Sequence, residues 1–331
     1  MQRPSKINET GQEMSIMNLK GISTLVTGGN GAVGCNLVRK LLEQGSKVTV
    51  LDDFSQSDSG NLPKRQNLII VKGDITDKKS LSKVFSKRFD YVFHLAARFA
   101  NELSVKDPIE DLKVNVQGTL QVLLYASKQK PARFLYTSSS SLYGHQENPI
   151  MKEDMIPNPS TPYATSKLTA EYYCKSIHKL YGMDYTIVRL SNSYGPYDPP
   201  GRFRNVIPNF FENAMSGKPL TITGTGKETR DFTFVEDCVD GIILAATKKA
   251  GRNEIFNLGT GKETQIRDIA RLILDITNSR SKIKHKPMRS FDHVRRRKMD
   301  VSKAKRMLGY DPGTTIGQGL DKTYQWFLTR R

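Results

Sequence analysis

The 331-residue sequence predicts an α/β fold in which a doubly wound parallel sheet carries a smaller α+β domain. Three observations lead to this fold class. A glycine-rich turn joins a β-rich run to a helical segment near the start of the chain. Further short β-rich runs recur with helical segments between them, as in a parallel sheet covered by helices. The length suits about two domains, or one large α/β unit with an appendage.

The first unit consists of a strand, a glycine turn and a helix, expected at residues 22–27, 28–34 and 36–44. This context gives a glycine motif its weight as a dinucleotide site of the Rossmann type. Gly28 permits the tight turn, Gly31 lets the backbone approach a pyrophosphate, and Gly34 lets the helix pack closely on the strand. The helix N-terminus then faces the phosphates. The candidate cofactor-binding residues of the turn are Gly28, Asn30, Gly31, Ala32, Val33 and Gly34.

A second strand, expected at 47–51, ends in Asp52 and Asp53. An acidic residue about 20 positions beyond the glycine turn is suited to accept hydrogen bonds from ribose hydroxyls. Its charge would also repel a 2′-phosphate, so the sequence favours NAD over NADP as the cofactor. The alternative is that Asp52 is only a turn residue at the end of a strand, but its position favours the ribose role.

Two more strands are expected, at 68–71 and 91–95. In a doubly wound sheet the carboxyl ends of such strands line the ligand crevice. The candidate cofactor-binding residues at these two ends are Asp74, Ile75, Leu95, Ala96 and Ala97.

The domain limits follow from this order of elements. We expect a cofactor domain at 21–195 to which the chain returns at about 229–260. The smaller, substrate-binding domain would comprise 196–228 and 261–331. Residues 1–20 are polar and show little periodicity, which predicts a flexible tail.

Tyr163 and Lys167 stand four residues apart in a segment, 163–181, with a helical pattern, so they share one face of the helix. A free tyrosine has a pKa of about 10 and is a poor base at neutral pH. A cation held nearby favours the phenolate and lowers that pKa. The pair is therefore a candidate proton-transfer device, although the pattern alone is common.

Composition narrows the class of partner. The net charge is +18, and twelve Lys and Arg residues fall between Arg280 and Arg306. A basic surface can attract nucleic acid, but no interleaved aromatic residues or binding motif favour that partner over a solvated basic surface. Three scattered cysteines and five histidines give no metal-ligand spacing. The chain has no membrane-length apolar run and no secretory signal, which predicts a cytoplasmic protein.

The sequence resembles the extended short-chain dehydrogenase/reductase family. Within it, the pattern is most similar to the NAD-dependent nucleotide-sugar epimerases and dehydratases of the UDP-glucose 4-epimerase type. The resemblance covers about residues 21–312. The motifs, in chain order, are Thr27-Gly28-Gly29-x-Gly31-x-x-Gly34, Gly73-Asp74-Ile75, His94-Leu95-Ala96-Ala97, Asn115-Val-Gln-Gly118-Thr119, Ser138-Ser139-Ser140-Ser141-Leu142-Tyr143-Gly144, Tyr163-x-x-x-Lys167, Arg189-Leu-Ser-Asn192-Ser-Tyr-Gly195-Pro196 and Arg230-Asp231-Phe232.

The resemblance implies the catalytic roles. Tyr163 would be the acid/base, and Lys167 would bind the nicotinamide ribose and lower the pKa of Tyr163. Ser139 would hydrogen-bond the substrate oxygen that gains or loses a proton. Within the serine run, Ser140 is the alternative to Ser139, and Ser141 is a further candidate for substrate contact.

The resemblance also implies the binding roles. Asp74 and Ile75 would flank the adenine, and Asn115 would support the backbone of the active site. The substrate's phosphates would be held by Asn192, Asn205 and Arg230. For Arg230 the alternative is an ion pair with Asp231 or Glu228; the planar fork of its guanidinium favours phosphate.

The residues after Ser139 bear on the chemistry. Family members that dehydrate or decarboxylate commonly carry acidic residues there, but this chain has Ser140 and Ser141, which cannot protonate a leaving hydroxyl at neutral pH. Glu147 and Glu153 are too distant in sequence to be assigned. The leading expectation is an NAD-dependent nucleotide-sugar 4-epimerase that acts through a transient 4-keto sugar.

Three alternatives remain open. Two are enzymes of the same family, a 4,6-dehydratase and a ketosugar reductase. The third is a non-catalytic, basic relative that binds nucleic acid. The resemblance further implies a homodimer, in which helices near 119–128 and 163–181 pair with those of a second copy.

Overall fold

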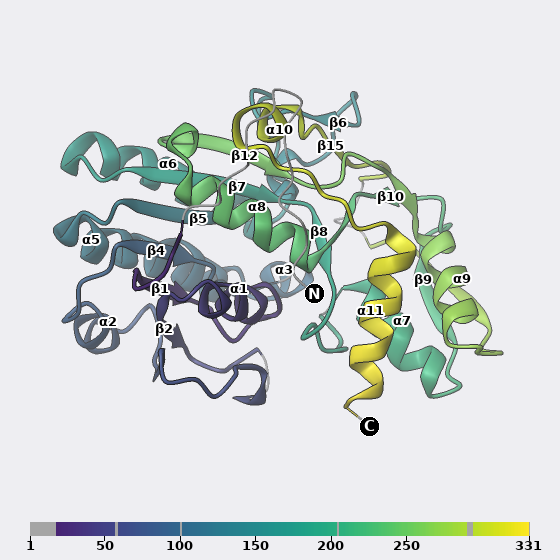
Figure 1. Cartoon of the computed structure of the whole chain (residues 1–331). Coiled ribbons are helices and arrows are strands. Elements are labelled where there is room, and N and C mark those ends of the chain that lie inside the picture. Colours follow the sequence, from purple (N-terminus) through teal and green to yellow (C-terminus); the bar gives the residue numbers. More distant parts are fainter. Residues whose placement is uncertain (1–17, 57–58, 100, 204, 290–293, 331) are drawn as a thin grey trace.

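The computed structural model describes residues 18–56, 59–99, 101–203, 205–289 and 294–330. Within them the main sheet has seven strands, and every neighbouring pair is parallel. In spatial order the strands are β12 (Glu254–Leu258), β7 (Tyr185–Leu190), β5 (Arg133–Ser139), β4 (Tyr91–His94), β1 (Ser23–Thr27), β2 (Lys47–Asp52) and β3 (Leu68–Lys72). The predicted doubly wound parallel sheet is confirmed (Figure 1).

The order of the strands reverses between β1 and β4. From β1 the chain builds outward through β2 to β3, and it then returns to β4 on the other side of β1. Such a switch point leaves a crevice at the carboxyl ends of the strands, where ligands bind in open α/β sheets. The first four strands lie within one residue of their predicted limits.

Helices cover both faces of the sheet. One face carries α1 (Ala32–Glu43), α8 (Val235–Thr247) and α10 (Ser302–Leu308), and the other carries α2 (Lys78–Val84), α5 (Thr119–Gln129) and α6 (Pro162–Tyr181). Helix α1 begins four residues before its predicted start, because Gly31 is already its N-cap. None of the helices in the described residues is long and apolar enough to cross a membrane.

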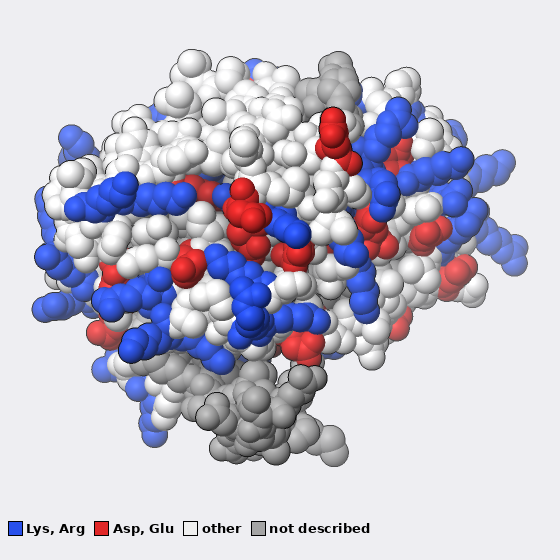
Figure 2. Space-filling model, turned by 90° about the horizontal axis from the view of Figure 1, so that it is seen from above, with Lys and Arg blue, Asp and Glu red and all other residues white. Residues whose placement is uncertain are grey.

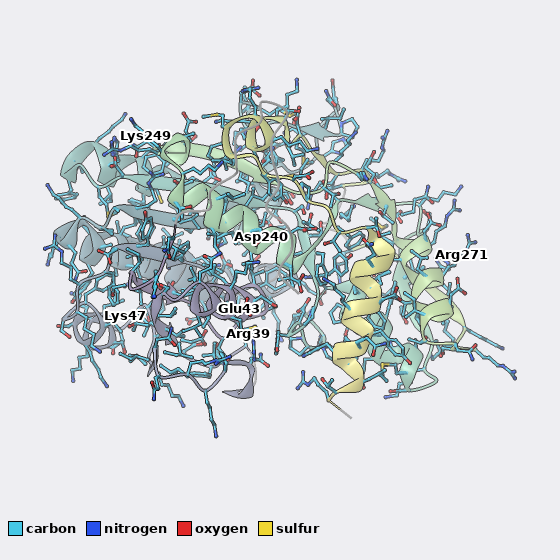
Figure 3. The ribbon with its side chains drawn as sticks, viewed as in Figure 1. Arg39, Glu43, Lys47, Asp240, Lys249 and Arg271 are labelled. Carbon is cyan, nitrogen blue, oxygen red and sulfur yellow. The ribbon has the colours of Figure 1, made fainter. Side chains whose placement is uncertain are left out.

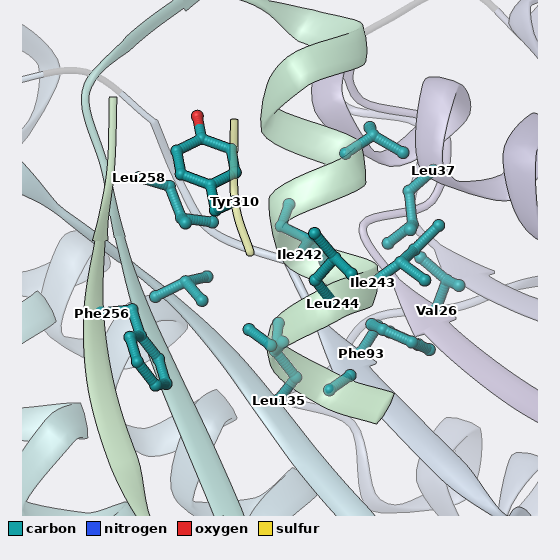
Figure 4. Packing of buried hydrophobic residues seen from close by; sticks show 14 of the residues in the cluster. Val26, Leu37, Phe93, Leu135, Ile242, Ile243, Leu244, Phe256, Leu258 and Tyr310 are labelled. Carbon is teal, nitrogen blue, oxygen red and sulfur yellow. The ribbon is translucent and has the colours of Figure 1, made fainter. Parts of the chain in front are cut away.

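The core between α8 and the sheet fixes these layers. Ile242 and Ile243 of α8 are buried in one cluster with Phe93 of β4 and Leu135 of β5 (Figure 4). Each such burial stabilises the fold by about 1.5–3 kcal/mol. At the surface, Asp240 of α8 forms an ion pair of 3.1 Å with Lys40 of α1, so the two helices lie side by side (Figure 3).

A smaller domain adjoins the sheet domain (right in Figure 1) and has its own core. Its elements are α7 (Val206–Met215), α9 (Ile266–Ile276) and α11 (Ile316–Leu328) with the strand pairs β9 (Leu220–Thr223) and β14 (Ile283–Lys286), and β10 (Thr229–Arg230) and β13 (Thr264–Gln265). Between the domains run β8 (Asn192–Tyr194) with β11 (Phe232–Phe234), and β6 (Ile150–Met151) with β15 (Lys298–Met299).

Two segments pack differently from the division expected from sequence. Leu19, in the expected tail, is buried in the core of the sheet domain. Ala304, Leu308 and Tyr310, expected in the smaller domain, are buried in the same core. Ala304 and Leu308 are four residues apart, so they form one apolar helix face that must be covered, and α8 and β12 cover it. Residues 1–17 lie outside the described residues.

Basic side chains are prominent on the surface. Lys and Arg outnumber Asp and Glu on the face shown in Figure 2, and they gather at both its left-hand and its right-hand end. The right-hand end is the α9 end of Figure 1. Some of the 280–306 cations are paired: Arg289 lies 3.1 Å from Glu102, and Arg296 lies 2.6 Å from Glu263. Part of the basic segment therefore serves ordinary surface ion pairs.

Candidate active site

A cavity of about 450 Å³ lies at the carboxyl ends of the parallel strands and extends from the glycine turn to Tyr163. It is lined by most of the predicted cofactor residues. These are Gly28, Gly31, Ala32, Val33, Gly34, Asp52, Asp53, Asp74, Ile75, Leu95, Ala96, Ala97, Tyr163 and Lys167. Ser139 and Asn205 of the predicted substrate set also line it.

The glycine turn is shaped by close backbone contacts. Gly28 has a φ of +69°, and a Cβ there would lie 2.6 Å from the backbone nitrogen of Ala96. A Cβ at Gly34 would overlap the carbonyl oxygen of Gly28. A Cβ at Gly31 would meet only that same oxygen, at 3.4 Å. Two of the glycines are thus required by the fold itself, whereas Gly31 leaves room on the cavity side.

Asp52 ends β2 and is held by the turn it faces. Its carboxylate accepts hydrogen bonds from the N–H groups of Asn30 and Phe54, each at 2.8 Å. Burial raises the pKa of Asp52, whereas these two hydrogen bonds act in the lowering direction. Asn30 contributes its backbone here, and its side chain is buried away from the cavity lining. Asp53 accepts from the N–H and hydroxyl of Ser55 at 3.0 and 2.8 Å.

Helix α6 brings Tyr163 and Lys167 to one face, as predicted. The helix begins there because the Thr161 hydroxyl caps the N–H of Ala164 and Pro162 occupies the first turn. The backbone N–H of Tyr163 donates to the hydroxyl of Ser104 at 3.0 Å. Both reactive side chains are buried, Tyr163 at 5% and Lys167 at 3% exposure.

Burial dominates the electrostatics of Tyr163. It raises the pKa of the phenol well above its ordinary value, and the hydrogen bond with Ser139 acts in the lowering direction. The ring of Phe99 meets the Tyr163 ring edge to face, with centroids 6.0 Å apart. The Tyr163 side chain is therefore held between an apolar ring and a hydroxyl, in surroundings that favour the neutral phenol.

Lys167 reaches back to the sheet. Its ammonium donates to the carbonyl oxygen of Thr137 at 2.9 Å and lies 5.0 Å from the centroid of the Tyr136 ring. Burial lowers the pKa of Lys167 to about 8, while the carboxylates of Asp111 and Glu171 act in the raising direction. The charge on Lys167 thus depends on buried acidic neighbours.

The serine run separates into cavity and core positions. Ser139 lines the cavity, accepts from the N–H of Ser141 and donates to its hydroxyl, both at 3.1 Å. Ser140 is buried outside the cavity lining. Of the two serines considered for the same role, Ser139 and not Ser140 therefore lies on the cavity lining.

Asn115 lies beside the cavity rather than on its lining. Its side-chain oxygen accepts from the N–H of Arg98 at 2.8 Å, and its amide donates to the carbonyl oxygen of Arg98 at 3.1 Å. Arg98 lines the cavity, so Asn115 supports the active-site backbone there. The Asn115 amide also donates to the buried carboxylate of Asp111 at 2.8 Å.

The three expected phosphate ligands are not placed alike. Asn205, the N-cap of α7, lines the cavity. Asn192 in β8 and Arg230 in β10 do not, and the guanidinium of Arg230 donates to the carbonyl oxygen of Thr229 at 2.9 Å. The structure therefore brings only Asn205 of these three to the cofactor cavity.

Sequence reasoning missed several residues of the site. Asp111, on α4 (Pro108–Leu112), carries no motif, yet it is fully buried behind the pair. Ser191 and Ser193 line the cavity on either side of Asn192. Arg98 and Phe99 also line the cavity. Side chains alternate between the two faces of a strand, so Ser191 and Ser193 share a face that Asn192 does not. This alternation could have identified the two serines from the sequence.

These residues fit NAD. Gly31 leaves open space on the cavity side that a side chain would fill. A carboxylate stands at the end of β2, where ribose hydroxyls are expected. The Tyr163/Lys167 pair closes the other end of the cavity. Fold and site together define a Rossmann-type enzyme of nicotinamide-dependent chemistry.

Comparison with known proteins identifies the family. The model of the NAD-dependent epimerase/dehydratase family matches residues 24–259, and the chain belongs to that family. It is 35% identical to a UDP-glucose 4-epimerase of Mycolicibacterium smegmatis, over 93% of this chain and 99% of that protein. It is also 35% identical to a UDP-N-acetyl-α-D-glucosaminuronate decarboxylase of Bacillus cytotoxicus, over 92% and 97%. An epimerase structure from Methanothermobacter thermautotrophicus superposes with a TM-score of 0.92 at 42% identity, covering 94% of each chain.

The family supplies the coarse function. The chain is an NAD-dependent enzyme of the nucleotide-sugar epimerase and dehydratase type. Because an epimerase and a decarboxylase are equally similar to it, overall identity does not select the reaction.

Proposed function

We propose that the chain is a nucleotide-sugar 4-epimerase of the UDP-glucose/UDP-galactose type. The observation that carries the proposal is the buried Tyr163 between Ser139 and Lys167 at the end of the cofactor cavity. A single acid/base beside a hydroxyl suffices to move one proton to and from one sugar oxygen. Epimerisation at C4 needs no more than this from the protein.

Elimination and decarboxylation each require further catalytic groups in the site. The residues that follow Ser139 do not favour either reaction. Dehydration requires a second group to protonate the leaving hydroxyl. Ser140 and Ser141 stand where such acids would follow Ser139. Of the two nearby glutamates, Glu153 accepts from the N–H of Asn257 at 2.8 Å, and neither it nor Glu147 lines the cavity.

In the proposed reaction Tyr163 takes the proton of the 4-hydroxyl and later returns it. The Ser139 hydroxyl holds the same oxygen, so that its position does not change as the proton leaves. Lys167 carries the positive charge that favours the Tyr163 phenolate and donates to the nicotinamide ribose. NAD, when bound, supplies the reversible hydride chemistry.

The diphosphate would be held at the border of the two domains. Asn205 lines the cavity from the start of α7, where backbone N–H groups favour anions. Asn192 stands on β8, which runs between the domains, and Arg230 stands on β10 of the smaller domain. We assign these three residues to the phosphates and sugar, because a substrate that extends from Tyr163 must leave the cofactor cavity on this side.

Turnover without added reductant tests the proposal. Purified enzyme is incubated with UDP-glucose, UDP-galactose and their N-acetyl and uronic acid analogues, and products are resolved by chromatography and NMR. We expect C4 epimers, and we expect Tyr163→Phe to bind NAD but to lose about 10²-fold or more in kcat.

Products other than C4 epimers would contradict the proposal and would indicate another reaction of the family. Loss of CO₂ would indicate a decarboxylase, a 4-keto-6-deoxy product a dehydratase, and stoichiometric use of NADH a reductase. Salt-dependent RNA binding with no sugar turnover would indicate the non-catalytic alternative.

We also propose a homodimer through α5 and α6. These helices pack on each other and leave Leu124, Tyr172 and Leu180 exposed. Apolar residues on two adjacent helices suit a four-helix interface with a second copy. Sedimentation should give a dimer that Leu180→Lys weakens; a control, Ile156→Lys, alters an exposed isoleucine outside these helices. A monomeric wild-type protein would contradict the proposal.

A further inference from the structure

Asp111 is a buried acid to which neither sequence motif nor family description gives a role. It lies on the short helix α4, which packs against α6. Its side chain is fully buried. One carboxylate oxygen accepts from the hydroxyl of Ser166 at 2.6 Å and the other from the amide of Asn115 at 2.8 Å. A donor on each oxygen suits the ionised form. Burial raises the pKa of this carboxyl, and the two hydrogen bonds act in the lowering direction.

The two partners of Asp111 lead to the active site in two directions. Ser166 immediately precedes Lys167 on α6. Asn115 holds the backbone of Arg98, which lines the cavity. The carboxylate thus ties the turn of α6 that carries Lys167 to the loop that faces the substrate.

Lys167 needs a counter-charge, because its ammonium is buried and donates to a neutral carbonyl, that of Thr137. The titratable groups that face it in the described structure are His94 on β4, Tyr136 on β5, Asp111 on α4, and Tyr163, Glu171 and Cys174 on α6. The candidates for negative charge are therefore few.

Most of these groups are neutral or already paired. Burial lowers the pKa of His94 to about 3 and raises that of the Cys174 thiol, so both are uncharged at neutral pH. Glu171 is bound by both arms of the Arg189 guanidinium, at 3.0 and 2.8 Å. The hydrogen-bond partners of Asp111, by contrast, are a neutral hydroxyl and a neutral amide.

We propose that Asp111 is a positioning residue that supplies the buried counter-charge of Lys167 and fixes the turn of α6 on which Lys167 lies. The catalytic consequence of this inference rests on the proposed function, whereas the effect of Asp111 on the charge of Lys167 does not. Without the Asp111 charge, the desolvated ammonium would lose its proton closer to neutral pH. The cation that favours the Tyr163 phenolate would then be lost with it.

The direct test is an NMR titration of ¹³C-labelled lysine in the wild-type protein and in Asp111→Asn. The Lys167 signal is identified by its absence in Lys167→Met. In Asp111→Asn we expect the midpoint of Lys167 to move to lower pH by about one pH unit or more. An unchanged midpoint in a folded variant would overturn the proposal.

Two further variants separate charge from position and from general damage. Ser166→Ala removes a hydrogen bond but keeps the Asp111 charge, so the Lys167 midpoint should move much less. An equal shift would overturn the assignment to charge. Asp237→Asn neutralises a buried carboxylate on α8, which accepts from the N–H of Thr314 at 3.0 Å, and should leave the midpoint in place. A shift there would equally count against Asp111.

The ionisation state of Asp111 can be measured in the wild-type protein, so this test does not depend on the folding of a variant. In wild-type protein labelled at the aspartate carboxyl carbon, the Asp111 signal should report an ionised group from neutral pH to the midpoint of the Lys167 titration. A protonated Asp111 in that range would end the proposal.

Activity then tests the catalytic consequence. The alkaline limb of the kcat profile should move to lower pH in Asp111→Asn, by the same amount as the Lys167 midpoint. If the midpoint moves and the kcat profile does not, the role in catalysis is refuted. If wild-type enzyme turns over no nucleotide sugar, the proposed function fails instead, while the NMR titrations still decide the charge pairing.

Discussion

The ammonium nitrogen of Lys167 lies 5.8 Å from the centroid of the Tyr163 ring, and both side chains are buried. Burial raises the pKa of the phenol and lowers that of the ammonium, so the cofactor-free pocket shifts each group towards its neutral form. Positive charge brought by a bound nicotinamide would act in the opposite direction on Tyr163.

This arrangement predicts that Tyr163 ionises only in the presence of cofactor at neutral pH. The tyrosinate absorbance of wild-type protein minus that of Tyr163→Phe should be negligible from pH 7 to about pH 10 without NAD. Added NAD should bring the titration to lower pH. A phenolate signal at neutral pH in cofactor-free protein would show that burial does not control this residue.

The glycine turn predicts two different outcomes for the same substitution. Gly34→Ala should destabilise the apoprotein by about 1–3 kcal/mol, because its Cβ overlaps the carbonyl oxygen of Gly28. Gly31→Ala should fold within about 1 kcal/mol of wild type, yet bind NAD more weakly, because a methyl group enters the space for the pyrophosphate. Urea unfolding and calorimetric NAD titration measure the two effects. Equal NAD affinity in Gly31→Ala would contradict the assigned path of the pyrophosphate.

Asp52 should set the choice between the two nicotinamide cofactors. Asp52→Asn should raise the affinity for NADP relative to NAD by about tenfold or more, because a negative charge beside the 2′-phosphate is removed. Fluorescence titration of NADH and NADPH gives the ratio. Asp53→Asn is the matched comparison, because Asp53 also lines the cavity and is the neighbouring carboxylate. A larger effect at Asp53 would move the ribose site to that residue.

The buried ion pair between Glu171 and Arg189 should matter for folding. The two side chains are 2% and 4% exposed, and Arg189 also donates to the hydroxyl of Tyr143 at 2.8 Å. Glu171→Gln should lower the free energy of unfolding by about 3–5 kcal/mol, because the guanidinium keeps its charge without a counter-ion. The exposed pair of Lys322 with Glu236 offers a control: Glu236→Gln should cost about 1 kcal/mol or less in the same urea experiment.

His94 should make the fold sensitive to acid. Its Nε2–H donates to Thr119 at 2.9 Å, because the Thr119 hydroxyl itself donates to Asn115, and its Nδ1 accepts from Thr27 at 2.6 Å. Burial lowers its pKa to about 3, so the folded state binds this proton less readily than the unfolded chain does. The stability contribution is therefore complete above the unfolded pKa of about 6.5 and declines as the pH falls from there towards 3.

The expected loss through His94 is roughly 2 kcal/mol between pH 7 and pH 5. Urea unfolding at both pH values measures it, with His94→Gln as the variant that lacks the titrating ring. Its stability should fall less steeply with acid, whatever its stability at pH 7. A parallel decline in the two proteins would place the acid sensitivity elsewhere.

Local sequence determined most of the fold and the cofactor end of the site. The limits of the first four strands and of α6 were predictable because hydrophobic periodicity, the glycine turn and the i to i+4 spacing of Tyr163 and Lys167 are all short-range properties. Asp52 could be found because it follows its strand directly. Their assigned roles in binding and catalysis stay predictions.

Tertiary structure decided what surrounds those residues. Asp111 and Ser166 are 55 residues apart and meet only because α4 packs on α6, and no local pattern encodes that contact. The same holds for Asn192 and Arg230, which have suitable side chains but lie outside the cavity lining. Sequence alone named Tyr163 and Lys167 as the candidate reacting pair. Packing between distant segments set their burial and the neighbouring charges, and hence the direction in which each pKa moves.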